Sequence, residues 1–114
     1  MFYYLSGIIH DKKNEAIVID VGGVGYYIFV TTTTLRDLPP LQEWVKLYTY
    51  FYVRDDEVSL YGFLKEDERN LFAEVLGVAG IGPRGALAIL GTLSVSDFTY
   101  AVLNEDYDVL VRTP

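Results

Sequence analysis

The amino-acid sequence predicts a five-stranded β-barrel in its first 64 residues, followed by a group of short helices. In the first part, runs rich in Tyr, Val, Ile, Phe and Thr are divided by turn signals, which is typical of strands. After Phe63 the spacing of apolar residues changes from two to the three or four of a helix. A hydrophobic share of 51% and a charged share of 22% indicate a folded chain.

Five segments of the first part are predicted strands: residues 2–10, 15–21, 26–32, 44–53 and 58–63. The first break, residues 11–14, is polar, and the second, residues 22–25, holds glycines that tolerate positive φ. Residues 33–42 contain Leu38, Pro39 and Pro40, and we expect them to form a connection between strands. Short strands joined by hairpins favour a small barrel of the OB-fold type.

The segment 44–53 alternates in a way that defines two strand faces. One face holds Val45, Leu47, Thr49, Phe51 and Val53, and the other holds Trp44, Lys46, Tyr48, Tyr50 and Tyr52. Aromatic rings on a barrel can stack on unpaired bases. Tyr is also simply a good strand residue, and we expect most of the ten tyrosines to pack against the barrel.

The second part is predicted to hold four helices. Residues 65–77 place Leu71, Phe72, Val75 and Leu76 on one face, behind an acidic first turn. Residues 84–90 continue as a helix, with Pro83 in its first position and Gly91 at its end. Two short helices are expected at about 94–104 and 105–111. The predicted domains are therefore 1–64 and 65–114.

The connection Gly80-Ile81-Gly82-Pro83 between two of these helices resembles a helix-hairpin-helix turn. The glycines permit a tight turn, and the N–H groups at the start of the second helix favour an anion such as a DNA phosphate. Arg84 lies in the first turn of that helix and can add a charge-assisted contact. The same residues also suit a plain helix–helix connection. A dinucleotide site is excluded because the glycines follow a helix rather than a strand.

Asp55 and Asp56 lie in the charged turn between the last two predicted strands. Such a pair is usually ordinary turn chemistry. Paired carboxylates can also hold a metal in a nuclease, but neighbouring strand residues point to opposite faces, and no third acidic partner is evident. Arg54 either contacts a phosphate or pairs with its acidic neighbours, and the sequence leaves both open.

Charge and cysteine content bound the function further. The net charge of −7 argues against a general nucleic-acid binder, because non-specific affinity comes largely from Lys and Arg. Without cysteine, and with His10 as the only histidine, we expect no disulfide, no metal and no other cofactor. No run reaches the ~18 apolar residues of a membrane span, so we expect a cytoplasmic protein with no membrane partner.

Six blocks of the sequence resemble the RuvA family in order and spacing. They are Leu5-Ser6-Gly7-Ile8-Ile9, Asp20-Val21-Gly22-Gly23-Val24-Gly25-Tyr26, Val53-Arg54-Asp55-Asp56, Leu60-Tyr61-Gly62-Phe63, Glu68-Arg69-x-Leu71-Phe72 and Gly80-Ile81-Gly82-Pro83. This resemblance implies an OB-fold domain and a helix-hairpin-helix domain that bind four-way (Holliday) DNA junctions, independently of base sequence. It also implies roles in recombination, DNA repair and the SOS response to DNA damage.

The resemblance further implies a non-catalytic subunit that forms a homotetramer, or an octamer of two tetramers. The hexameric ATPase RuvB would drive DNA through the complex, and the resolvase RuvC is a further expected partner. Gly80, Ile81, Gly82, Pro83 and Arg84 would bind DNA phosphate, Asp55 and Asp56 would form an acidic pin at the junction centre, and Arg54 is a candidate junction contact.

The sequence departs from the family pattern at its end. The glycines of a second hairpin, the basic helix after it and the RuvB-binding domain are absent, so we expect a shortened chain or a cleavage product. The missing hairpin would bring basic residues, which helps to explain the charge of −7. The alternative function is an OB-fold module that binds proteins and not DNA.

Overall fold

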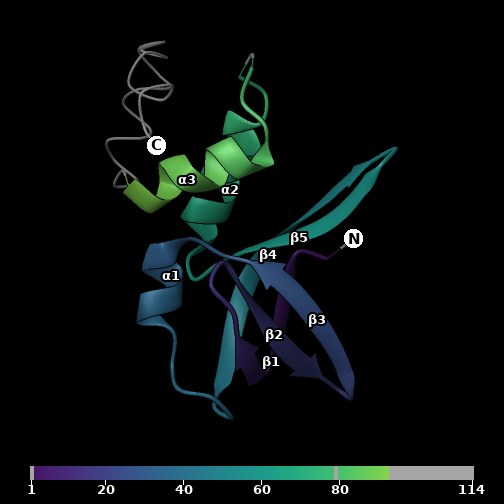
Figure 1. Ribbon diagram of the computed structural model, residues 1–114, viewed down its shortest axis with the longest axis vertical. Helices are drawn as coiled ribbons and strands as arrows, with labels where there is room; N and C mark the ends of the chain where they lie inside the picture. The colour runs from purple at the N-terminus through teal and green to yellow at the C-terminus, as the bar shows by residue number, and fades with distance from the viewer. Residues whose placement is uncertain (1, 79, 93–114) are drawn as a thin grey trace. The chain divides into compact units, whose positions relative to one another are not determined.

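The structure is a computed structural model that describes residues 2–78 and 80–92 (Figure 1). The chain divides into two compact units, Met1–Glu66 and Asp67–Pro114, which are described separately. The helices predicted at 94–104 and 105–111 lie outside the described residues. The assignment of 1–64 and 65–114 as functional domains stays a prediction.

The first unit is a closed five-stranded barrel, which confirms the predicted fold class. Its strands are β1 (Tyr4–Lys12), β2 (Ala16–Val21), β3 (Val24–Phe29), β4 (Trp44–Arg54) and β5 (Glu57–Phe63). They follow one another around the barrel in the order β1-β2-β3-β5-β4, and β4 closes the barrel by pairing with β1. The pairing of β3 with β5 is parallel, and hairpins alone do not predict it.

Residues 33–42 lie between β3 and β4, as predicted, but the first part of this connection is helical, which the sequence analysis did not predict. Helix α1 spans Thr32–Asp37. Thr31 caps it, because its Oγ1 accepts a hydrogen bond from the Thr34 N–H at 3.0 Å. The predicted third strand was misplaced for the same reason: its last residue, Thr32, is helical. That strand also begins earlier than predicted, since the turn before it is only Gly22 and Gly23, both at positive φ.

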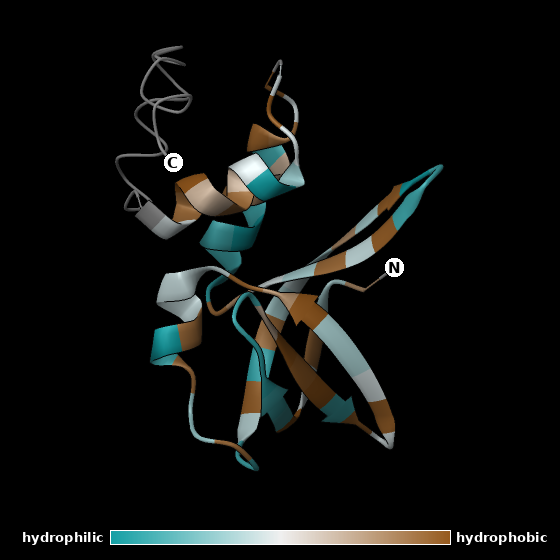
Figure 2. Cartoon of the chain, viewed as in Figure 1, coloured by the Kyte–Doolittle hydropathy of each residue, from teal (hydrophilic) through white to brown (hydrophobic). Residues whose placement is uncertain are grey.

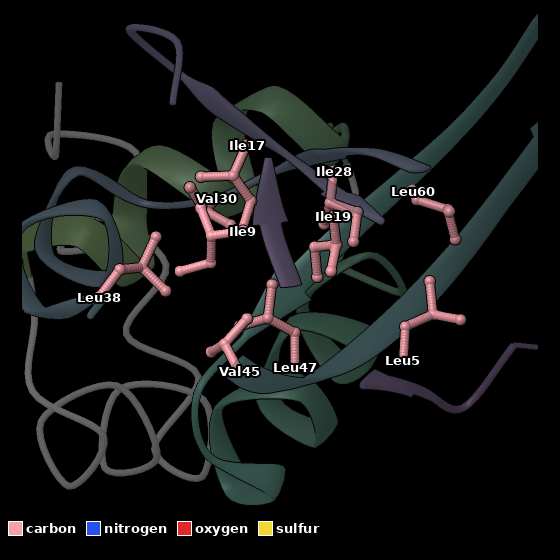
Figure 3. Close-up of a cluster of buried hydrophobic side chains, with 10 residues drawn as sticks. All are labelled: Leu5, Ile9, Ile17, Ile19, Ile28, Val30, Leu38, Val45, Leu47 and Leu60. Carbon is pink, nitrogen blue, oxygen red and sulfur yellow. The ribbon is translucent and has the colours of Figure 1, made fainter. Parts of the chain in front are cut away.

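The core of the barrel consists of aliphatic side chains from all five strands, together with Val30 and Leu38 (Figure 3). Two glycines permit this packing. A Cβ on Gly62 would lie 2.6 Å from Cγ2 of Ile28, and one on Gly7 would lie 2.3 Å from the carbonyl oxygen of Asp20. Both positions therefore exclude any larger residue without a shift of the neighbours.

Strands β4 and β5 continue past the barrel as a two-stranded arm, residues 52–59, visible as the long hairpin in Figure 1. Up to Thr49 the predicted alternation of β4 is confirmed: Val45, Leu47 and Thr49 are buried, while Trp44 and Lys46 are exposed. Along the arm apolar and polar residues still alternate (Figure 2). There the side chains of Val53 and Val58 are 47% and 67% exposed, so the hydrophobic core does not extend to the tip of the arm.

Two helices are described beyond the barrel: α2 (Glu66–Val75) and α3 (Pro83–Thr92). Leu71, Phe72 and Val75 are buried as predicted, whereas Leu76 lies in the following turn and is half-buried. The expectation that Gly91 ends its helix was wrong, because α3 continues through it to Thr92. No helix in the described part of the chain is long and apolar enough to cross a membrane.

Candidate nucleic-acid interface

The tip of the arm is a two-residue turn formed by Asp55 and Asp56. The strands pair up to the last residue on each side, Arg54 opposite Glu57. Both aspartates are exposed, and no ion pair within the described residues involves either of them. The structure thus places two exposed carboxylates, neither of them in an ion pair with a described residue, at the end of a narrow projection.

Arg54 does not pair with its acidic neighbours in the described part of the chain. Its Cζ lies 4.5 Å from the centre of the Tyr52 ring, within the range of a cation–π contact. Its Nη1 donates a hydrogen bond to the carbonyl oxygen of Val53 at 2.8 Å. The pairing that the sequence left open is therefore absent here, and the guanidinium lies back along the arm.

Glu57, the residue opposite Arg54, is held by its own strand. Ser59 Oγ donates a hydrogen bond to Glu57 Oε2 at 2.8 Å, and the Tyr61 hydroxyl donates to the same oxygen at 3.4 Å. Sequence reasoning missed this group. The signal was the spacing of two between residues 57, 59 and 61, which puts them on one face of a strand.

The second candidate site is the turn between α2 and α3. It is built from short-range backbone hydrogen bonds, including Gly77 N–H to Glu74 O at 3.0 Å and Ile81 N–H to Val78 O at 3.2 Å. Gly80 is exposed with a φ of 82°, a conformation that favours glycine. The turn thereby reverses the chain and leads directly into α3.

Gly82 immediately precedes α3, and its carbonyl accepts the helical hydrogen bond from Ala86 N–H at 2.9 Å. It is exposed, its φ is not in the left-handed region, and a Cβ built on it would meet no atom of the described residues within 4 Å. Residues 2–78 and 80–92 therefore give no steric reason for glycine here. A ligand that approaches the backbone closely would give one.

The residues predicted to bind phosphate surround the start of α3. Pro83 is its first residue, Ile81 is half-buried beneath the turn, and Arg84 is exposed in the first turn. The first N–H groups of a helix have no partner within it, and they point toward its N-terminal end with the positive pole of the helix dipole. Such a helix start can bind an anion. Whether DNA phosphate occupies it stays a prediction.

Other charged and aromatic groups of the barrel are engaged locally. Lys13 Nζ lies 2.8 Å from Asp11 Oδ2, and this hydrogen-bonded pair lowers the pKa of Asp11 and raises the pKa of Lys13. Lys46 Nζ lies 4.2 Å from the Tyr4 ring centre and 5.0 Å from that of Tyr48. Among the described residues, no group of three or more His, Cys, Asp or Glu side chains is placed to hold a metal ion.

Fold and site together define a class: an OB-type barrel with a projecting acidic arm, followed by a helical hairpin whose turn exposes two glycines and a helix start. The RuvA N terminal domain family matches residues 1–62. The chain therefore belongs to the RuvA family.

Curated proteins that are named as RuvA subunits align with nearly the whole chain. The chain is 42% identical over 114 residues to the Holliday junction branch migration complex subunit RuvA of Caldanaerobacter subterraneus subsp. tengcongensis. It is 43% identical to the protein of that name from Coxiella burnetii and 39% identical to that from Acetivibrio thermocellus. These alignments cover 98 to 100% of the chain and 61%, 57% and 55% of the three relatives, respectively. The chain thus spans a little over half the length of the relatives that it matches.

Proposed function

We propose that the chain binds four-way DNA junctions by their shape, as the non-catalytic DNA-binding part of a branch-migration complex. The observation that carries the proposal is the exposed turn at Gly80 and Gly82, which leads into α3 and whose second glycine is crowded by no neighbour in the described part of the chain. Phosphate contacts at such a turn position a protein on DNA without reading the bases. Recognition would therefore be independent of sequence.

The arm supplies the selectivity for a junction over a continuous duplex. Its exposed carboxylates, Asp55 and Asp56, would repel phosphates that come close to the tip. At ~4 Å that repulsion is about 1 kcal/mol in water and about 4 kcal/mol at the intermediate dielectric of a protein surface. In an open junction the DNA strands would lie apart around the arm. A continuous duplex would bring its phosphates close to Asp55 and Asp56, so binding of the duplex would be disfavoured.

Assembly determines how strongly the chain binds. One hairpin contributes few contacts, but four copies around a fourfold junction act together through their effective concentration. We propose a homotetramer, or two tetramers facing each other, with RuvB as the motor and RuvC as a later partner in recombination and repair. The names of the relatives place those proteins in a branch migration complex, which supports this assignment.

A gel-shift series tests the proposal with three labelled DNAs of equal length: four-way junction, duplex and single strand. We expect the junction to be retarded at the lowest protein concentration, and only where sedimentation shows that the chain oligomerises. Equal affinity for junction and duplex contradicts shape recognition. Tight junction binding by a proven monomer contradicts the role of assembly. Absence of DNA binding by the folded chain favours a protein-interaction module instead.

A further inference from the structure

Arg54 and Glu57 occupy directly opposite positions of the β4–β5 pairing, yet their side chains form no ion pair with each other. Opposite charges facing each other across two strands normally attract and stabilise the sheet. Each of the two side chains instead has other partners. Arg54 lies over Tyr52 and donates to the Val53 carbonyl, while Glu57 accepts from Ser59 and Tyr61.

The pairing register explains how the two charges are kept apart. Tyr52 is opposite Ser59, one step along the same face toward the barrel. The Tyr52 ring also packs edge-on against Tyr61, with ring centres 6.3 Å apart, and Tyr61 is fully buried. Tyr52 thereby has a fixed neighbour at the foot of the arm, and its ring lies under the guanidinium. The hydroxyl of Ser59 meanwhile donates a hydrogen bond to one oxygen of the carboxylate, Glu57 Oε2.

Arg54 keeps most of its hydrogen-bond donors available because it is not paired with Glu57. A guanidinium has five N–H donors, and the structure describes a single hydrogen bond for this one, to Val53. The remaining donors have no hydrogen-bond partner among the described residues, and the exposed guanidinium, held over the Tyr52 ring, has the planar shape that suits a phosphate. An ion pair with Glu57 would occupy them and cancel the positive charge on the flank of the arm.

We propose that Tyr52 and Ser59 are positioning residues that keep Arg54 open to a DNA phosphate by holding it apart from Glu57. The inference rests on the proposed function, because it takes DNA as the ligand of the arm. The arm then has an acidic tip that repels phosphate and, below it, a cationic flank that attracts phosphate. Together they would place the DNA strands beside the arm and away from its end.

The first test measures the side chain of Arg54 in the protein without DNA. A guanidinium stacked on a tyrosine ring gives upfield-shifted Arg54 side-chain proton signals in NMR. We expect this shift in the wild type and in Tyr52→Phe, its loss in Tyr52→Leu, and its reduction in Ser59→Ala, where Glu57 can turn to Arg54. Ser59→Ala combined with Glu57→Gln should restore it. An unchanged Arg54 shift in Ser59→Ala overturns the inference.

The second test measures junction affinity at several salt concentrations. Ser59→Ala should weaken junction binding about two- to fivefold, as expected for one new cross-strand ion pair, and should flatten the dependence of affinity on salt. The same substitution should have no effect in a Glu57→Gln or an Arg54→Gln background, whereas a merely structural role would persist in both.

Binding measurements on Arg54→Gln and Ser59→Ala distinguish a failure of this inference from a failure of the proposed function. If Arg54→Gln weakens binding but Ser59→Ala does not, the inference is wrong and the proposed function stands. If Arg54→Gln binds like the wild type, Arg54 is not a DNA contact and the inference is wrong as well. If the folded chain binds no junction at any concentration, the proposed function itself fails.

Discussion

Gly7 in the barrel and Gly82 in the helical hairpin differ in what requires them. A Cβ on Gly7 would lie 2.3 Å from a backbone oxygen of the neighbouring strand, whereas a Cβ on Gly82 would meet no atom within 4 Å among the residues that the structure describes. Neither needs a left-handed φ. The packing of the barrel therefore requires the first glycine, whereas no described neighbour requires the second, and the space around it leaves room for a ligand.

The largest expected effect is on stability, at Gly7. Gly7→Ala forces the methyl group against Asp20 O and two side chains, and overpacking of this kind costs about 1–3 kcal/mol. Urea unfolding measures this loss. Gly25→Ala is the matched control in the same barrel, since its Cβ would make only an ordinary contact, at 3.4 Å, with Val18. A similar loss for both variants would show that steric space does not distinguish the glycines.

The second prediction concerns Gly82. Gly82→Ser adds a small side chain at a helix N-cap, where serine is favourable, so the free energy of unfolding should change by less than about 0.5 kcal/mol. Junction affinity should fall about tenfold, because one hydrogen bond to a charged acceptor is worth roughly 1.5 kcal/mol or more. Urea unfolding measures the stability of the variant, and the fluorescence anisotropy of a labelled junction measures its affinity for DNA. Unchanged affinity in the stable variant would mean that no ligand approaches this backbone.

The third prediction concerns the tip of the arm. Changing Asp55 and Asp56 together to Asn keeps size and turn preference but removes the charge. Duplex affinity should then rise about fivefold relative to junction affinity, which corresponds to about 1 kcal/mol of repulsion relieved. Competition binding at matched salt measures the ratio. If the double variant has the wild-type ratio of duplex to junction affinity, Asp55 and Asp56 are ordinary turn residues with no part in selectivity.

The smallest expected effect is at Arg84, an exposed charge screened by solvent. Arg84→Ala should reduce the slope of log affinity against log salt by about 0.9 for each phosphate contact that is lost. Lys65→Ala, a charge removed outside the turn, is the control and should leave the slope unchanged. If Arg84→Ala also leaves it unchanged, then Arg84 does not bind phosphate.

The barrel was largely predictable because alternation in the sequence reports which face of a strand is buried. Val45, Leu47 and Thr49 follow that rule. The rule does not say where the core ends, so the exposure of Val53 and Val58 on the arm emerged only from the structure. Helix α1 was missed because its first turn is made of three threonines, which are weak helix formers. The only sequence signal for this helix is Thr31, a residue type that favours the N-cap position.

The candidate sites were predictable to different depths. The glycine turn and the acidic tip are contiguous in sequence, so their composition revealed them. The separation of Arg54 from Glu57 depends on the register of two strands and on hydroxyl groups at Ser59 and Tyr61. Pairing register and side-chain direction are set by the whole barrel, and a local pattern does not contain them.

The most direct test of the account is a map of the backbone amides that respond to DNA. A deuterated, 15N-labelled chain is titrated with a short four-way junction, and the amide chemical shifts are followed one by one. We expect the largest changes at Gly82, Arg84 and Gly85, with smaller changes along the flank of the arm and none in the interior of the barrel. If the changes instead concentrate on an outer barrel face and the amides of residues 80–85 do not move, the start of α3 is not the DNA contact.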